Sequence, residues 1–306
     1  MSSRYDLHAH TVCSDGILTP AELVARARAQ GVEVLALTDH DTTEGVSEAA
    51  AAAAASGIAL IPGAEISVTW EGQTVHVVGL GLDPANPVLA QGLARQRAFR
   101  DWRAQEIARR LEKRRIHGAL EGAARLARGS ILSRTHFARF LLEQGYVRSA
   151  QRAFKQFLAR GGAAYVPGKW AALPEVVGWI RGAGGQAVIA HPARYPLSAG
   201  RLRRLITEFK DCGGAGIEVV CGRHDPQANL RFAAVALEHG LLASLGSDYH
   251  GLEGPWVDLG RLAPLPESCT PVWHDWKVLR TEDSGLSSPP SVLGPQRSVL
   301  SPQSSI

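Results

Sequence analysis

The stretch that decides the fold is residues 19–41, which read TPAELVARARAQGVEVLALTDHD. The stretch opens as a helix, because Thr19 and Glu22 form a capping box around Pro20 at the first helical position, and Gly31 ends it. The apolar run Val34–Leu37 follows at once as a buried strand. A helix that runs directly into a strand is the repeating unit of an α/β fold.

The same alternation continues on both sides of this stretch. Residues 47–56 form an alanine-rich helix closed by Gly57, and further buried strands are predicted at 58–61, 75–80, 187–190, 216–220 and 241–245. Strands that alternate with helices predict a parallel sheet or a barrel. We therefore expect an α/β body.

A different pattern begins near residue 93. The segment 93–160 shows no strand signal and contains predicted helices at 97–115, 135–144 and 149–159. We interpret it as a helical insertion into a catalytic barrel made of residues 1–92 and 161–283. Residues 284–306 are rich in Ser, Pro, Gly and Gln, so we expect a disordered tail.

The composition is that of a globular protein, with 45% hydrophobic and 20% charged residues among 306. No run of about 18 apolar residues exists, so no membrane span is expected. The start of the chain lacks the apolar stretch of a secretory signal, and the four cysteines are scattered. These features predict a cytoplasmic location, and no obligate protein partner is evident.

The charge is distributed unevenly. The net charge is +4, but the segment 93–160 holds 17 basic and five acidic residues, a net of +12, which leaves −8 on the remainder. A basic block beside an acidic body indicates a polyanionic substrate or partner. The alternative is a solvated helical face of arginines.

Nine histidines and carboxylates stand at the edges of the predicted strands. His8 and His10 are two residues apart in an extended segment, so both imidazoles point to one face and can reach one metal ion. A single buried histidine is more often an ordinary core residue, but nine such groups converging at the mouth of a barrel require cations to compensate them. The predicted ligands are His8, His10, Asp15, His40, Glu65, His76, His191, Asp248 and His250.

These ligands offer nitrogen and oxygen without thiolate. That donor set favours Mn²⁺, with Zn²⁺ or Fe²⁺ as alternatives, and Mg²⁺ alone would not select so much imidazole. Nine ligands exceed the needs of one ion, so we expect two or three divalent ions, with Glu65 as a bridge.

The motifs that carry these ligands resemble those of the polymerase and histidinol phosphatase (PHP) family. They are DLHAHT at 6–11, SDG at 14–16, TDHD at 38–41, GAE at 63–65, His76, HP at 191–192 and SDYH at 247–250. The resemblance implies a distorted (β/α)₇ barrel, the PHP fold, with three metal ions. It assigns the first ion to His8, His10, Glu65 and Asp248. The second then belongs to Asp15, His40 and His250, and the third to Glu65, His76 and His191.

Within the family, the basic insertion and its segment SRTHFAR at 133–139 resemble the branch related to RNase AM. That resemblance implies hydrolysis of the 3′-phosphate of 3′,5′-nucleoside bisphosphates such as pAp, and 5′→3′ exoribonuclease activity on short RNA. The expected substrate is therefore a nucleotide or short RNA. The alternatives are a phosphatase of a small metabolite such as histidinol phosphate, and a non-enzymatic nucleic-acid-binding protein with structural metals.

The expected mechanism is attack on phosphorus by a metal-bridging water held by Glu65, Asp248 and His40. Arginine suits phosphate because its guanidinium binds two oxygens at once. The candidate substrate-binding residues are therefore Arg134, Arg100, Arg103 and His136. A surface position is the alternative for each of these four.

Overall fold

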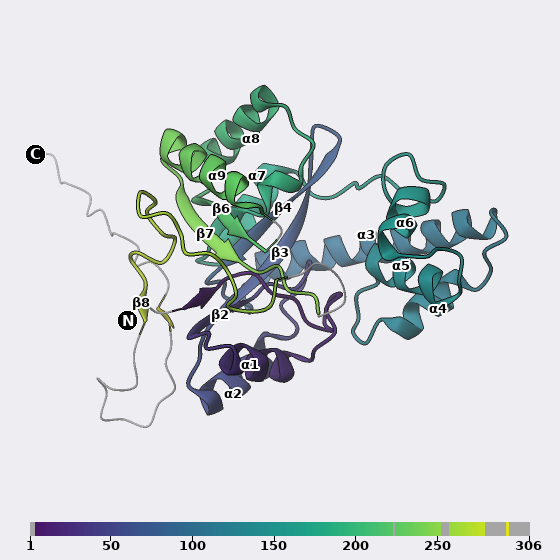
Figure 1. The fold of residues 1–306 in the computed structure, drawn as a ribbon, viewed down its shortest axis with the longest axis horizontal. Coiled ribbons are helices and arrows are strands. Elements are labelled where there is room, and N and C mark those ends of the chain that lie inside the picture. The colour runs from purple at the N-terminus through teal and green to yellow at the C-terminus, as the bar shows by residue number, and fades with distance from the viewer. Residues whose placement is uncertain (1–3, 223, 252–256, 279–291, 294–306) are drawn as a thin grey trace, which may run out of the picture.

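Figure 1 shows the fold in a computed structural model, which describes residues 4–222, 224–251, 257–278 and 292–293. The main sheet contains seven strands: β1 (Tyr5–Asp6), β2 (Val34–Leu37), β3 (Ala59–Trp70), β4 (Gln73–Leu80), β5 (Gln186–Ile189), β6 (Gly216–Cys221) and β7 (Leu242–Gly246). The strands lie in chain order, and neighbours are parallel except around β4, which is antiparallel to both β3 and β5.

The two ends of this sheet approach each other. The backbone N–H of Leu7 donates to the carbonyl of Leu245 at 3.1 Å, and Ala9 forms a parallel bridge with Tyr249. The sheet is therefore a nearly closed barrel of seven strands, which confirms the predicted α/β class and the predicted seven-stranded barrel.

The expectation that the strands are parallel is wrong for β4. A two-residue turn at Glu71 and Gly72 joins β3 to β4, and both residues have positive φ, 45° and 72°. Such a turn folds two strands into an antiparallel hairpin. The predicted strand at 58–61 corresponds to the start of β3, which continues to Trp70, directly before the turn. Because β4 runs in the opposite direction, its first residues, including His76, lie at the mouth where the other strands end.

Helices cover the outside of the barrel (Figure 1). One group packs against β3–β7: α7 (Leu173–Gly182), α8 (Ala199–Asp211) and α9 (Pro226–His239). The helices α1 (Pro20–Ala29) and α2 (Val46–Ser56) cover the side of β2. Inside the barrel, Val34, Ile61 and Val188 form a buried cluster with Val272 and Trp276, from the segment after β7. Apolar side chains therefore fill part of the barrel interior.

The insertion lies to one side of the barrel (Figure 1). It contains α3 (Pro87–Glu112), α4 (Ala119–Leu126), α5 (Arg134–Glu143), α6 (Ala150–Ala153) and a π-helical turn, η1 (Phe154–Leu158). Ile107 and Phe137 belong to a buried cluster of its own, whereas Leu89 and Leu93 of α3 pack into the barrel cluster. The boundary at residue 93 therefore falls inside one continuous helix, and the division into two units stays a prediction.

Two further elements complete the description. A short 3₁₀-helix, η2 (Pro192–Arg194), follows β5, and β8 (Lys277–Val278) pairs antiparallel with β9 (Val292–Leu293). The predicted tail at 284–306 otherwise lies outside the described residues. Among the described helices, none combines the length and apolar character that a membrane span requires.

Candidate metal centre

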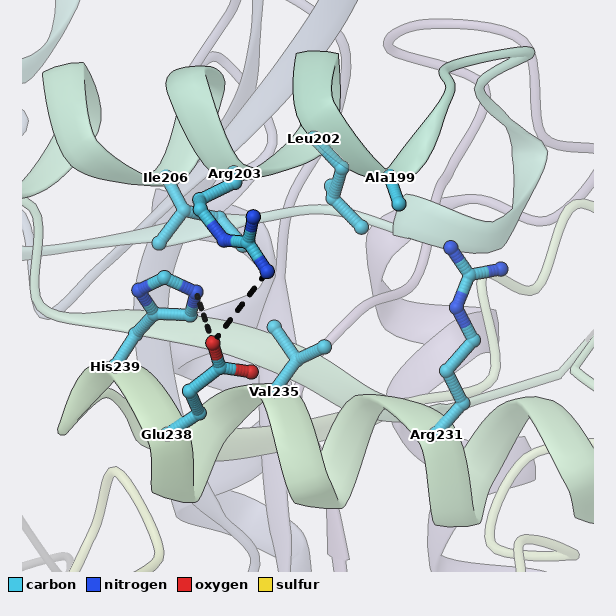
Figure 2. A pocket seen from close by; sticks show the side chains of 8 residues that line it. All are labelled: Ala199, Leu202, Arg203, Ile206, Arg231, Val235, Glu238 and His239. Atoms are coloured by element: carbon cyan, nitrogen blue, oxygen red, sulfur yellow. Dashed lines mark ion pairs between the residues drawn. The ribbon is translucent and has the colours of Figure 1, made fainter.

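A surface pocket lies between α8 and α9, outside the barrel (Figure 2). Its volume is about 130 Å³, and Glu238 faces both Arg203 and His239, at 3.8 and 3.9 Å. None of the nine predicted ligands lines this pocket. This pocket is therefore separate from the predicted metal centre, whose residues lie at the barrel mouth.

The first ligands lie just beyond β1. The two histidines of the H-x-H motif flank Ala9, whose backbone N–H donates to Thr38 Oγ1 at 3.0 Å. This bond fixes the extended segment, and residues two apart then share a face. His8 and His10 are fully buried, and their Nε2 atoms lie 3.1 Å apart.

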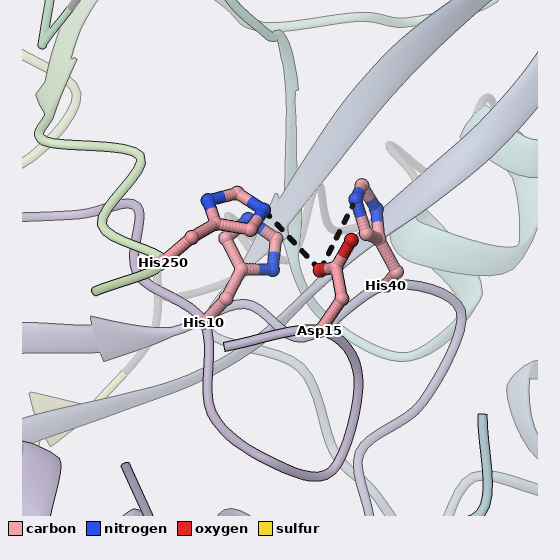
Figure 3. Close-up of side chains that lie close together, drawn as sticks. All are labelled: His10, Asp15, His40 and His250. Atoms are coloured by element: carbon pink, nitrogen blue, oxygen red, sulfur yellow. Dashed lines mark ion pairs between the residues drawn. The ribbon is translucent and has the colours of Figure 1, made fainter. Parts of the chain in front are cut away.

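The turn after this segment is tied down by Asp39. One of its carboxylate oxygens accepts from the backbone N–H of Thr11 at 2.7 Å and from Ser14 Oγ at 2.5 Å. The turn directs Asp15 between two histidines, with Oδ1 at 3.2 Å from His250 Nε2 and 3.8 Å from His40 Nε2 (Figure 3). The sequence positions 15, 40 and 250 thus meet in one cluster.

Glu65, in the middle of β3, occupies the centre of the site and is fully buried. Its Oε1 lies 2.7 Å from His76 Nδ1 and 2.7 Å from His191 Nε2. Its Oε2 lies within 3.4 Å of a nitrogen of His40, His10 and His8. One carboxylate thus contacts five imidazoles, which is the position that a bridging ligand requires.

The last ligands follow β7. Asp248 Oδ1 lies 3.3 Å from His10 Nε2 and 3.5 Å from His250 Nδ1. Its other oxygen accepts from Arg194 Nη1 at 2.6 Å. Sequence reasoning missed Arg194, although it stands only three residues after His191, at a strand end that was already recognised.

All nine predicted ligands therefore lie together, and atoms of eight of them form three groups that could each hold a metal ion. The first group equals the predicted first set. The second adds His10 to the predicted second set, and the third contains His40 where the prediction has His191, although His191 also contacts Glu65. The groups are His8, His10, Glu65 and Asp248; His10, Asp15, His40 and His250; and His40, Glu65 and His76.

The chemistry of these donors fits divalent cations. Asp15 Oδ1, Glu65 Oε2 and Asp248 Oδ1 are buried and accept no hydrogen bond from the described residues. Buried polar atoms are normally paired, and an unpaired carboxylate oxygen is costly. Cations among three carboxylates and six imidazoles would satisfy them, which makes this a divalent-metal site.

The three carboxylates and two of the imidazoles have protonation states that fit cation binding. Burial raises the pKa of the Glu65 carboxyl, but His76, His40 and His8 outweigh it and hold that pKa well below its usual range. Burial chiefly lowers the pKa of His10 to about 3 and that of His76 to about 4. Ionised carboxylates and neutral imidazoles are the forms that bind metal ions. Burial would lower the pKa of His8 and His250, but the surrounding carboxylates outweigh it and raise both pKa values, so these two rings would release a proton when a cation binds.

His8 has a partner that sequence reasoning missed. Glu218, on β6, is buried, and its Oε1 lies 2.7 Å from His8 Nδ1 while its Oε2 accepts from the backbone N–H of His191 at 2.5 Å. A carboxylate on Nδ1 turns Nε2 of His8 toward the other ligands. The available signal was a charged residue inside the apolar strand GIEVVC at 216–221.

The backbone around the site is strained. Asp41, His191 and Asp248 have positive φ values of 51°, 28° and 53°. Such values are uncommon for residues other than glycine and persist where surrounding structure holds them. All three residues are predicted ligands or lie directly beside one.

The insertion reaches the centre through α5. Ser133, its N-cap, donates from Oγ to Asp15 Oδ2 at 3.0 Å, so the N-terminus of α5 faces the ligands. His136 is 1% exposed and lies in the same cap, where its Nδ1 accepts from the Ser133 N–H. The surface alternative is therefore wrong for His136, whose contact with substrate stays a prediction.

The three candidate arginines differ in their partners. Arg100 and Arg103 are buried, so the surface alternative is wrong for both. Arg100 donates to Asp41 Oδ2 at 2.7 Å, and Arg103 donates to the carbonyl of Val166. Arg134 is half-buried, and its guanidinium carbon lies 5.7 Å from the centre of the Phe154 ring. Burial and the charge of Arg100 lower the pKa of Arg134. A bound anion would therefore stabilise the charged guanidinium.

Known proteins share this sequence and architecture. The PHP domain matches residues 6–159. The chain is 47% identical over 275 residues to the 5′-3′ exoribonuclease Rnm of Escherichia coli, covering 89% of this chain and 94% of that protein. It is also 47% identical over 281 residues to a 3′,5′-nucleoside bisphosphate phosphatase of Chromobacterium violaceum, covering 91% and 99%.

A solved structure has a similar sequence and the same fold. An amidohydrolase from Chromobacterium violaceum, with bound sulfate and no metal, has a TM-score of 0.85 and 47% identity, covering 89% of this chain and 95% of that one. The family match spans half of this chain, the relatives are matched over almost their full length, and the fold is the same. The chain therefore belongs to the PHP family.

Proposed function

We propose that this protein hydrolyses the 3′-phosphate of 3′,5′-nucleoside bisphosphates such as pAp, and removes nucleotides from short RNA in the 5′→3′ direction. The observation that carries the proposal is the contact between Ser133 and Asp15, which brings the basic insertion against the metal ligands. The metal centre would then act on the phosphate that is cleaved, while arginines of the basic insertion bind the remaining phosphate of the same substrate. The two similar relatives, a bisphosphate phosphatase and an exoribonuclease, support both activities.

One reaction accounts for both substrates. In each case the bond that breaks joins phosphorus to the 3′-oxygen of the first nucleoside, and water supplies the new oxygen. The bisphosphate releases inorganic phosphate and a 5′-nucleotide. Short RNA releases the same 5′-nucleotide, while the remainder keeps the attacked phosphate at its new 5′ end. A site that positions the first nucleotide by its 5′-phosphate therefore serves both.

When bound, the divalent ions, for which we infer Mn²⁺, would acidify a water molecule and neutralise charge on the phosphoryl oxygens. The protein's side chains would hold these ions and position the phosphates of the substrate beside them. Glu65 and Asp248 are the carboxylates at the centre, and Glu218 fixes the ring of His8. Arg134, beside the N-terminus of α5, would bind the 5′-phosphate, because helix N-termini and guanidinium groups both attract phosphate. Arg100, already paired with Asp41, would act mainly by holding the loop after β2.

The alternative, a phosphatase of a small metabolite such as histidinol phosphate, is less favoured. A small ester does not need a segment of net charge +12, nor a half-buried Arg134 without a carboxylate partner among the described residues. A purely structural metal site would not need nine ligands. We further infer that the protein acts in the cytoplasm without an obligate protein partner.

A substrate comparison tests the proposal. Phosphate or nucleotide release is measured with pAp, AMP, histidinol phosphate and a 5′-phosphorylated oligoribonucleotide, each with Mn²⁺ and with chelator. We expect metal-dependent turnover of pAp and of the oligoribonucleotide, and little of AMP. Faster turnover of histidinol phosphate than of pAp would overturn the proposal in favour of the metabolite phosphatase.

A further inference from the structure

A row of aromatic side chains runs along α3 and into solvent. Trp102 is 49% exposed, an unusual exposure for so large a side chain. Its ring stacks on Phe99, with centroids 5.4 Å apart and an interplanar angle of 27°. Phe99 in turn meets Trp170 edge to face at 4.7 Å. The three rings form a continuous row from a buried inner end to an exposed outer end.

The inner end of the row adjoins the metal centre. The guanidinium carbons of Arg100 and Arg103 lie 5.0 and 5.4 Å from the centre of the Trp170 ring. Arg100 also donates to Asp41, the neighbour of the predicted ligand His40. A chain of contacts therefore runs from the loop that carries His40, through Arg100 and the rings of the row, to the exposed side chain of Trp102.

Packing explains only part of this row. Trp170 is buried, and its Nε1 donates to Thr74 Oγ1 at 3.1 Å, so its position is fully accounted for within the fold. Phe99 fills the space between the two tryptophans. The outer face of Trp102 has no such role, and no aromatic partner beyond Phe99 is present among the described residues.

The surroundings indicate what the exposed ring would bind. Two of the three rings, Phe99 and Trp102, lie on the segment 93–160 of net charge +12, which attracts a polyanion. Flat aromatic rings interleaved with guanidinium groups are the usual means of holding single-stranded nucleic acid, because every base offers a face for stacking. A nucleic acid is thus the polyanion that both the charge and the rings suit.

We propose that Trp102, supported by Phe99, stacks on a base of single-stranded RNA downstream of the phosphate that is cleaved. The inference rests on the proposed function and deepens it, because it identifies the part of the surface that distinguishes RNA from a bisphosphate. A bisphosphate ends at its 3′-phosphate and has no downstream base to stack on Trp102. An oligoribonucleotide continues past that phosphate, and its next bases can follow the rings outward.

The test compares wild type with Trp102→Ala on two substrates, pAp and a 5′-phosphorylated hexaribonucleotide, under the same metal conditions. Loss of base stacking should lower kcat/KM for the hexamer about five- to a hundredfold, while pAp turnover changes less than twofold. Trp102→Phe should recover most of the loss, because a ring is restored. Turnover of pAp by the wild type reports the proposed function separately, so failure of either idea is distinguishable.

Tyr146→Ala provides the matched control. Tyr146 is 43% exposed and packs on Phe140 beyond the C-terminal end of α5, the end opposite to the one that contacts Asp15. It is an exposed aromatic of the same insertion, but it lies away from the row. We expect Tyr146→Ala to leave kcat/KM for the hexamer within twofold of wild type.

A binding measurement gives a readout without turnover. In chelator, fluorescence anisotropy of a labelled hexaribonucleotide should show weaker binding to Trp102→Ala than to wild type or Tyr146→Ala. Equal loss on pAp and the hexamer, or equal loss in both variants, would overturn the proposal. Unchanged RNA affinity together with a change in oligomeric mass would overturn it too, and would assign the ring to a contact between copies of the chain.

Discussion

At the scale of single residues, Glu218 orients two ligands with one carboxylate. It contacts the ring of His8 through Oε1 and the backbone of His191 through Oε2. The His191 backbone has a positive φ of 28°, which needs such support. Removing the carboxylate would leave His8 and His191 in place but would remove the contacts that orient them.

We therefore expect Glu218→Gln to lower metal affinity and kcat/KM by about 10- to 100-fold, the usual effect of losing a group that orients a metal ligand. Glutamine can still accept from His8, but its amide nitrogen cannot accept from the His191 N–H. Metal titration and pAp turnover measure the two effects. Glu208→Gln is the control, because Glu208 accepts from Trp70 Nε1 away from the centre. Similar losses in both variants would contradict the orienting role.

Arg134 leads to a second prediction at this scale. Arg134→Ala should reduce kcat/KM for pAp by about ten- to a hundredfold, because a charge-assisted contact to the 5′-phosphate is lost. Hydrolysis of p-nitrophenyl phosphate, which has no second phosphate, should change little.

Arg125→Ala is the matched control for that variant, since Arg125 is exposed and paired with Glu143. This variant also removes one positive charge from the insertion, but from α4 rather than from the first turn of α5. Equal losses of Arg134→Ala on both esters would mean that Arg134 supports the fold or the shared transition state. Unchanged kcat/KM on both esters would favour the alternative function, a phosphatase of a small metabolite.

At the scale of elements, the cap of α5 joins the insertion to the barrel, and it depends on a neutral histidine. His136 Nδ1 accepts from the Ser133 N–H, and burial chiefly lowers the pKa of His136 from 6.5 to about 4. A protonated Nδ1 could not accept that bond. The cap should therefore contribute a pH dependence of its own to stability.

The sign follows from proton binding. Between about pH 6.5 and pH 4 the unfolded chain binds a proton at His136 and the folded chain does not, so this residue's contribution to stability falls as pH falls, by up to about 1.4 kcal/mol per pH unit. His136→Gln keeps an acceptor but cannot titrate. We expect the variant to gain stability relative to wild type as pH is lowered from 7 to 4.5, as measured by urea unfolding.

His117→Gln, which replaces an exposed histidine, controls for the loss of an imidazole in that experiment. The metal-binding histidines titrate in all three proteins, so their contribution cancels in the difference between variants. A constant difference between wild type and His136→Gln across this pH range would contradict the role of the cap.

At the scale of the whole molecule, the metal centre joins most of the barrel. Its ligands come from β3, β4 and the segments that follow β1, β2, β5 and β7. Ions that bind only the folded chain stabilise it by mass action, by about 2.7 kcal/mol at a free concentration one hundred times Kd. Saturating Mn²⁺ should therefore raise Tm by several degrees over chelator.

Differential scanning calorimetry measures this effect, and Glu65→Gln is the informative variant. Glu65 contacts five imidazoles, so its loss should remove most of the metal-dependent increase in Tm. Ca²⁺, which prefers oxygen ligands, should have a smaller effect on the wild type than Mn²⁺. The same Tm with Mn²⁺ and with chelator would exclude a metal centre of this kind.

The barrel and the meeting of the nine candidate ligands could be predicted because both follow local rules. Apolar runs mark the strands, and parallel strands collect the residues at their C-terminal ends. The direction of β4 could not be obtained in this way, because the run 75–80 is equally apolar in either direction. The two-residue turn at Glu71 and Gly72, in which both residues have positive φ, sets the direction of β4.

The residues that support the ligands were harder to find. Glu218 lies on a strand, 27 positions beyond His191 and 210 beyond His8, and only folding brings the three together. The predicted helix at 97–115 begins later than α3, which starts at Pro87, because the first turns of α3 pack on the barrel and lack the basic residues that mark the rest of the helix. Long-range packing, rather than local pattern, decides such features.

The closure of the barrel between β1 and β7 has a consequence for the protein's synthesis on the ribosome. His8 and His10 emerge early, but Asp248 and His250 are added about 240 residues later, which takes roughly 12–50 s at about 5–20 residues per second. Throughout that interval the nascent chain holds an incomplete set of ligands. A complete metal centre can therefore form only after Asp248 and His250 have left the ribosome, because no partly synthesised barrel holds the full set of ligands.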